Sequence, residues 1–482
     1  MKTVTQTRAT RLATFVAQTA ADAMPDDVVS KAKRHVLDTF GAALAGTFAV
    51  ETCSARALTG TVAHGGATLW GTRRAAGARD AAFVNGIAAH ALELDDSGGC
   101  DHSGAVVLPA VLAALSCAGR PVAGRECVAA VVLGYDVGRR VLEAAGGYSA
   151  HNGAGWHSTL SCGVFGAAAA SARVFGLDAA RMRDALGHAA SFSGGLWGFI
   201  HDGSQTKRLH AGRAAEGGVL AALLAREGVS GPAQVFDDVW GGFFSAFAAQ
   251  SQVPDALTDG LGAHWKVMRC SIKPHASCRS AHAAVDAALQ LADGRTFEAG
   301  EIERVVVRAS AFVARMCGGR DLSTLSSAQM SLAYAVAAAL AFGDTGIDAY
   351  RDDRRTDARI TALLARIAIE VDPALGDLDE PTVILHRADG RRESRHVPIA
   401  LGDPRNPLSD AALLAKFRAL AGMALEQRAQ IDALSETCLS LERLTDARVL
   451  NALLATDGGA SVDTPKSSPS SKALHSRPTS RR

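Results

Sequence analysis

Apolar residues recur at helical spacing through the first half of the chain. In residues 26–46, Val36, Phe40 and Leu44 fall on one stripe of a helix that opens after Pro25. The same spacing predicts helices at 9–24, 79–95, 105–118, 123–145, 158–175, 178–191 and 208–228. We therefore expect an all-helical bundle here.

The pattern changes near residue 265, where β-branched runs alternate with helices. Helices are predicted at 279–294 and 326–342, and strands at 303–310, 367–371, 382–386 and 393–397. An Asp389-Gly390 turn joins the last two strands. Helical spacing returns after residue 403 and continues to residue 455. Beyond it, Ser, Thr, Pro, Gly and basic residues predominate, so we expect a disordered tail.

These blocks predict a mainly α protein with a large all-helical domain built from both chain ends and a smaller inserted α+β domain. The predicted divisions are 1–267 for the first helical part, 268–402 for the α+β domain, 403–456 for the second helical part, and 457–482 for the tail.

Composition limits the possible partners. A formal net charge of +1 provides no field for nucleic acid or an anionic membrane, so we expect a small-molecule partner. Nine cysteines without a CxxC pair fit free thiols in a reducing compartment. The N-terminus lacks the apolar core and cleavage site of a secretory signal, so we expect none. No apolar run reaches the roughly 18 residues that a membrane span needs. We therefore expect a soluble, cytoplasmic protein.

Candidate chemistry concentrates at the end of the helix predicted at 79–95. Glu93, Asp95 and Asp96 gather there, and His102 follows a Ser-Gly-Gly turn. Acids at a helix C-terminus oppose its macrodipole, which suggests a functional reason for them. The structural alternative is a solvated helix end that supplies an N-cap to the next helix.

Six motifs, in order, resemble those of the MmgE/PrpD family, which includes 2-methylcitrate dehydratase, cis-aconitate decarboxylase and iminodisuccinate epimerase. The motifs are Asn85–Ser97, His102–Pro109, Gly155–Thr159, Gln205–Gly212, Lys273–Arg279 and Gly402–Ser409. The resemblance covers residues 9–455. It implies a homodimer, a site between the helical domain and an α+β lid, and no metal or organic cofactor.

Carried over by motif, the family's site positions fall on Glu93, Ser97, His102, His157, Lys207 and Lys273, with Cys278 close by. We assign proton transfer to His102 and His157, because imidazole titrates near neutral pH. Which of them is the base stays open. Asp95 or Asp96 would orient an imidazole or bind a substrate hydroxyl, and Lys207 would stabilise developing negative charge. Substrate binding is expected from Glu93, Asp96, Ser97, Lys273, Cys278 and Arg279.

The leading hypothesis is a cofactor-independent hydro-lyase that acts on a small di- or tricarboxylate such as 2-methylcitrate. The alternatives are an epimerase or isomerase of an iminodisuccinate-like dicarboxylate, a cis-aconitate-type decarboxylase, and a catalytically silent binding protein. Family members commonly carry Asp at Glu93 and Thr at Ser97. In the decarboxylase branch a histidine stands at Cys278 and a tyrosine at Phe312, which disfavours decarboxylation here.

Structural interpretations remain open for single residues. His157 could be a core histidine, Lys207 with Arg208 a surface pair, and Lys273 with Arg279 a solvated stretch. The spacing of Cys270, His275, Cys278 and His282 matches no closed zinc signature, so no metal site is predicted.

Overall fold

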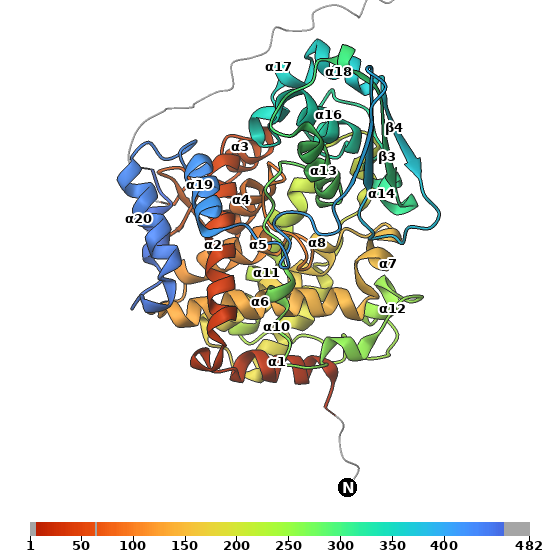
Figure 1. Ribbon diagram of the computed structural model, residues 1–482. Coiled ribbons are helices and arrows are strands. Elements are labelled where there is room, and N and C mark those ends of the chain that lie inside the picture. The colour runs from red at the N-terminus through yellow and green to blue at the C-terminus, as the bar shows by residue number, and fades with distance from the viewer. Residues whose placement is uncertain (1–5, 63–64, 457–482) are drawn as a thin grey trace, which may run out of the picture.

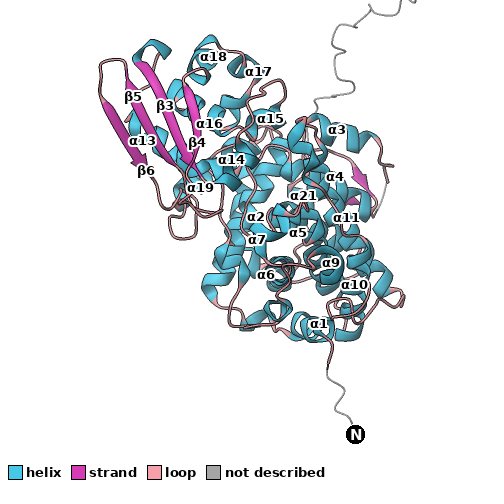
Figure 2. Cartoon of the chain, turned by 90° about the vertical axis from the view of Figure 1, so that its right-hand side faces the viewer, coloured by secondary structure: helices cyan, strands magenta, loops and turns pink. Residues whose placement is uncertain are grey.

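The computed structural model describes residues 6–62 and 65–456 of the chain. Helix accounts for 57% and strand for 7%, so the prediction of a mainly α protein is confirmed. Two hydrophobic cores organise the fold (Figures 1 and 2). One core lies in the helical part, residues 9–272 and 408–454. The other lies mostly in the α+β part, residues 276–400, and also takes in residues of the helical part that pack against it: Ala45, Ala91, Leu92, Leu94 and Leu420. The predicted tail at 457–482 lies outside the described residues.

Both ends of the chain build the helical part. Helix α19, which follows the α+β part, packs against α2, near the N-terminus (Figure 1). The helices of this part are α1 (Arg8–Gln18), α2 (Asp26–Gly46), α3 (Val50–Ala57), α4 (Ala78–His90), α5 (Ser103–Ser116), α6 (Gly124–Ala144), α7 (Gly147–Gly153), α8 (Ser158–Ser161), α9 (Gly163–Phe175), α10 (Ala179–Ser191), α11 (Thr206–Arg226), α12 (Phe243–Phe247), α19 (Asp410–Ala421), α20 (Arg428–Leu439) and α21 (Val449–Leu453). A short antiparallel pair, β1 (Ala67–Thr68) and β2 (Ala75–Ala76), precedes α4.

Small residues let the central helices approach closely. Where α4 meets α11, a Cβ built on Gly86 would lie 2.8 Å from the Cα of Gly212. Larger side chains at this crossing would push the helices apart, because buried interiors are close-packed. The contact holds the C-terminal end of α4 beside the N-terminal half of α11. It therefore fixes the distance between the acidic loop after α4 and Lys207 on α11.

A four-stranded sheet forms one side of the α+β part, in the order β4-β3-β5-β6 (Figure 2). Its strands are β3 (Ile302–Ala309), β4 (Ile367–Val371), β5 (Thr382–Arg387) and β6 (Arg392–His396). The parallel pair β3 and β4 needs a crossover, which helices supply. The helices of this part are α13 (His282–Ala292), α14 (Ala311–Cys317), α15 (Leu325–Gln329), α16 (Leu332–Phe342), α17 (Asp352–Arg355) and α18 (Ala358–Leu364). Helix α13 packs on β5 and β6, and α16 packs on α13.

Four predicted helices end well before their predicted bound or break. The one predicted at 9–24 ends at Gln18, because Thr19 has an extended backbone. The one predicted at 79–95 ends at His90, because the chain turns into a loop in which Glu93 has a φ of 53°. The one predicted at 158–175 divides at Cys162 into α8 and α9. The one predicted at 326–342 divides where the Ser331 side chain caps α16 by accepting a hydrogen bond from the Tyr334 amide.

The chain leaves the helical part and returns to it at neighbouring points. The Ile272 amide donates to the Gly402 carbonyl at 3.0 Å, and Ser271 pairs with Ser97 by two backbone hydrogen bonds. The domain boundaries at 268 and 402 stay a prediction. Within the described residues, no helix combines the length and apolar character that crossing a bilayer requires.

Candidate active site

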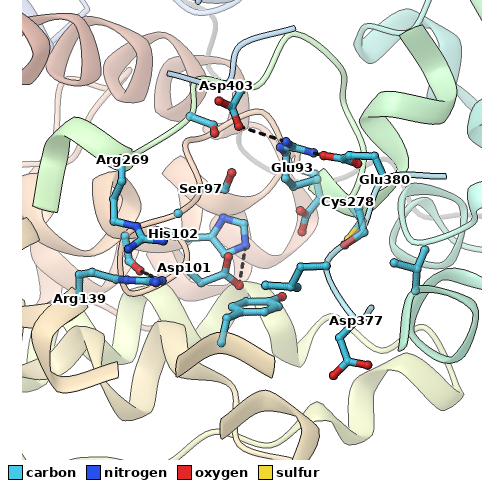
Figure 3. A pocket seen from close by; sticks show the side chains of 18 of the residues that line it. Glu93, Ser97, Asp101, His102, Arg139, Arg269, Cys278, Asp377, Glu380 and Asp403 are labelled. Atoms are coloured by element: carbon cyan, nitrogen blue, oxygen red, sulfur yellow. Dashed lines mark hydrogen bonds and ion pairs between the residues drawn. The ribbon is translucent and has the colours of Figure 1, made fainter. Parts of the chain in front are cut away.

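A cavity of about 240 Å³ lies between the helical part and the α+β part (Figure 3). Its walls come from the loop after α4, from α6 and α11, from residues 269–280, and from the loop between β4 and β5. Pockets for drug-sized ligands span about 300–1,000 Å³, so this cavity suits a smaller molecule.

Glu93 is the centre of a buried charge cluster on the cavity wall. Its carboxylate contacts the Nζ of Lys207, the Nζ of Lys273 at 3.2 Å, and the Nη1 of Arg208 at 3.5 Å. Burial by itself would raise the pKa of Glu93, but Lys207 and Lys273 outweigh it and hold that pKa well below its usual range. Glu93 thus faces three cations. Glu51, 3.8 Å from Nε of Arg208, is a second acid, so the cluster keeps one excess positive charge.

His102 lies between two aspartates. Its Nδ1 is 2.9 Å from Oδ2 of Asp95, and its Nε2 is 3.5 Å from Oδ2 of Asp101. Burial would lower the pKa of His102, but Asp101 and Asp95 raise it above its ordinary value. Figure 3 shows the imidazole inside the cavity with Asp101 beside it. The arrangement favours an imidazolium that can donate a proton.

His157 approaches the same aspartate from behind the cavity wall. Its amide donates to the Gly195 carbonyl at 3.0 Å, and its Nδ1 lies 2.8 Å from Nδ1 of His210. The Nε2 of His157 is 3.9 Å from Oδ2 of Asp101. Burial and then His210 lower the pKa of His157 well below its usual value, so this imidazole is neutral.

Comparison with known protein families adds to this geometry. Residues 10–255 match the MmgE/PrpD N-terminal domain, and residues 275–441 match the MmgE/PrpD C-terminal domain. The chain belongs to the MmgE/PrpD family.

Similar MmgE/PrpD proteins match this chain over nearly its whole length. A cis-aconitate decarboxylase-like protein of Aspergillus oryzae is 29% identical over 471 residues, which cover 92% of this chain and 96% of that protein. A cis-aconitate decarboxylase of Aspergillus terreus is 30% identical over 464 residues, covering 90% and 93%. The human cis-aconitate decarboxylase is 28% identical over 454 residues, covering 89% and 91%.

The structure brings most of the residues predicted from the MmgE/PrpD motifs to this cavity. Its lining includes Glu93, Ser97, His102, Lys207, Cys278 and Arg279. Lys273 lies behind the lining and reaches the cluster through Glu93, whereas Asp95 lies behind His102. The two predicted lysines therefore meet at one carboxylate, although they come from distant parts of the sequence.

Asp96 is placed differently from its predicted role in substrate binding. Its carboxylate accepts hydrogen bonds from Tyr135 at 2.7 Å and from the Gly104 amide at 2.9 Å, and it pairs with His35 at 2.8 Å. These partners belong to the helical core rather than to the cavity lining. Asp96 thus anchors the start of α5, immediately after His102.

Arg279 lines the cavity but is already paired. Its guanidinium lies 3.0 Å from Oε1 of Glu380 and 3.6 Å from Oδ2 of Asp403. A substrate carboxylate would have to compete with two acids for Arg279, so the predicted binding role is weakened.

The neighbouring Cys278 thiol has a pKa lowered to about 6, because Cys317 hydrogen-bonds to it.

Several cavity residues were not singled out from the sequence. Asp101 stands next to His102 but lies between the motifs Asn85–Ser97 and His102–Pro109 and carries no pattern of its own. Arg139 and Arg269 lie together on one side of the cavity, away from Cys278 and Asp377 on the other (Figure 3). Arg139 contacts Glu143 four residues further along α6, which from sequence is typical of a surface helix pair.

Two donor sets in the described residues could hold a metal ion, and sequence spacing revealed neither. They are His90 with Asp95 and His102, and Asp101 with His102 and His157. In the first set, His90 and His102 already bind Asp95 through their Nδ1 atoms. The set considered from sequence, around Cys270 and Cys278, is not among them.

Proposed function

We propose that this protein is a lyase acting on a small di- or tricarboxylate and that its own side chains supply the chemistry. The observation that carries this proposal is the position of the His102 imidazole beside the Glu93 cluster, where Lys207 faces the same cavity. An enolate-like intermediate needs fixed positive charge and a nearby proton donor. Both groups are present here.

Dehydration of a β-hydroxy acid would use His102 as the acid. A base removes the α proton, the electron pair of that C–H bond forms the new double bond, and the C–O bond breaks. The hydroxyl departs as water after it takes the Nε2 proton of His102. Because His157 lies behind the cavity wall, Asp101, which lines the cavity between the two imidazoles, would take the α proton and pass it to the neutral His157 at 3.9 Å. 2-Methylcitrate is the substrate to test first.

Decarboxylation is the second candidate. The cis-aconitate decarboxylases of Aspergillus terreus and human match this chain over about nine-tenths of their own length. In that reaction a C–C bond breaks, carbon dioxide leaves, and the carbanion takes a proton. His102 would supply this proton too. Cys278 and Phe312, which replace the histidine and tyrosine of the decarboxylase branch, weigh toward dehydration.

Epimerisation fits the geometry less well. It needs two bases on opposite faces of one carbon, whereas His102 and His157 converge on one oxygen of Asp101.

We further propose that the α+β part acts as a lid and that the active form is a homodimer, as the family resemblance implies.

The test is to incubate the purified protein with 2-methylcitrate and with cis-aconitate and to identify products by mass spectrometry. Loss of water supports the first candidate, and loss of carbon dioxide supports the second. His102→Gln should abolish either product, while His188→Gln, on α10 and outside the cavity, should not. Thermal stabilisation by these acids without turnover would instead favour the silent binding protein.

A further inference from the structure

Asp101 has an unusual local environment. Its side chain is nine-tenths buried, and within the described residues its carboxylate faces two imidazoles but accepts no hydrogen bond that meets ordinary geometry. Its φ of 125° is in a region that non-glycine residues rarely adopt. The imidazolium of His102 at 3.5 Å neutralises this carboxylate when no metal is bound, and a metal ion would replace the proton on that imidazole.

One carboxylate oxygen of Asp101 and two imidazole nitrogens lie close together. Oδ2 of Asp101 lies 3.5 Å from Nε2 of His102 and 3.9 Å from Nε2 of His157, and the three donor atoms lie within 4.8 Å of one another. Zn–N and Zn–O bonds of about 2.0–2.2 Å at tetrahedral angles place neighbouring ligand atoms about 3.3–3.6 Å apart. The separation between Asp101 and His102 fits this range, and His157 would have to move closer to both.

The outer partners of both imidazoles suit metal binding. Nδ1 of His102 is held by Asp95 at 2.9 Å, and Nδ1 of His157 is held by His210 at 2.8 Å. Metal-binding histidines use the second ring nitrogen in this way, which fixes the ring and directs the other nitrogen to the metal. Nε2 of His157 lies 3.2 Å from the Thr159 hydroxyl, and a metal ion would replace that contact. Because Asp101 and His102 line the cavity, a fourth coordination position would face it.

We propose that Asp101, His102 and His157 form a binding site for a divalent transition-metal ion such as Zn²⁺, with one position open to the cavity. Two imidazoles and one carboxylate are ligands that such ions accept. The bound ion would occupy Nε2 of His102 and remove it from proton transfer. Zn²⁺ is then an inhibitor, a consequence that rests on the proposed lyase function, whereas the binding itself does not.

The test is a Co²⁺ titration of the full chain, without an affinity tag and after treatment with a chelator. We expect one equivalent to bind and to give the visible d–d absorption of low-coordinate Co²⁺. Asp101→Asn should lose this absorption, and Asp377→Asn, at the opposite side of the cavity, should retain it (Figure 3). Circular dichroism and thermal melting establish that both variants are folded.

Three results would overturn the site: no Co²⁺ binding, unchanged binding in Asp101→Asn, or thiolate-to-metal charge-transfer bands that place a cysteine on the ion. These readouts hold even if neither test acid is turned over. Where turnover is found, Zn²⁺ should inhibit it. Each rate is normalised to that protein's own uninhibited rate. The Zn²⁺ concentration that gives half inhibition should then be at least about tenfold higher for Asp101→Asn than for the wild-type protein. Equal inhibition of both proteins would refute the inhibitory role.

Discussion

Replacing Glu93 with glutamine would leave Lys207 and Lys273 buried without the carboxylate that each contacts. Both lysine side chains are at most 2% exposed, so water can replace only a small part of that carboxylate's interaction. Breaking a buried ion pair from one side costs about 3–5 kcal/mol. An upper limit comes from deprotonation, because an unpaired buried lysine can release its proton and become neutral. At pH 7 this costs about 4.8 kcal/mol for a lysine of pKa about 10.5, so the penalty for each lysine cannot be much larger.

The expected change in melting temperature follows from the size of the protein. An unfolding entropy of about 2.1 cal/mol/K per residue gives roughly 1 kcal/mol per degree for a chain of this length. Glu93→Gln should therefore lower Tm by about 3–5 °C at pH 7. Thermal melts followed by circular dichroism measure this shift. The control is Glu370→Gln, which removes an exposed pair with Arg304 and should change stability by less than about 1 kcal/mol.

The pH dependence gives a second check. Because the folded state holds the pKa of Glu93 below its unfolded value, Glu93 contributes stability above about pH 4.5 and loses it as the pH falls through the folded pKa. The Tm difference between the wild-type protein and Glu93→Gln should therefore be full at pH 7 and shrink under acid conditions. An equal Tm for the two proteins at pH 7 would refute the charge-cluster reasoning.

Three further predictions concern single side chains. His102→Gln should reduce kcat by about 10²–10⁴ in the product assay, and a loss below tenfold would contradict its role in proton transfer. Tyr135→Phe removes a hydrogen bond to the Asp96 carboxylate and should cost about 1.5–3 kcal/mol, seen as a lower Tm; an unchanged Tm would exclude that contribution. Iodoacetamide should alkylate Cys278 at a rate that rises as the pH increases through about 6, since its thiolate accepts a hydrogen bond from Cys317. A rise only near pH 8.5, as in the free amino acid, would contradict this.

The elements were well predicted wherever local periodicity decides the structure. The stripe at 26–46 became α2 (Asp26–Gly46), and the β-branched run at 367–371 became β4 (Ile367–Val371), without a shift at either end. The early end of α4 was missed because its cause is tertiary. The loop after His90 follows the pairing of Glu93 with distant lysines, which no local pattern encodes.

The candidate site was partly predictable. Motif order was enough to indicate that Glu93, Lys207 and Lys273 would gather, and the structure brings them together. The direction of each side chain was not accessible, since it depends on packing. Thus Asp96 faces the helical core rather than the cavity, and Asp101 faces two imidazoles although nothing in its sequence neighbourhood marks it.

The hydrogen bond between Ile272 and Gly402 has a consequence for how such proteins diversify. Because the α+β part starts and finishes at adjacent points, a corresponding segment from a relative could be transplanted through two junctions only a few ångströms apart. Recombination there would exchange one wall of the cavity, including Cys278, Arg279 and Glu380, while the charge cluster around Glu93 would change only at Lys273. New substrate preferences could then arise by swapping cassettes on a constant helical base.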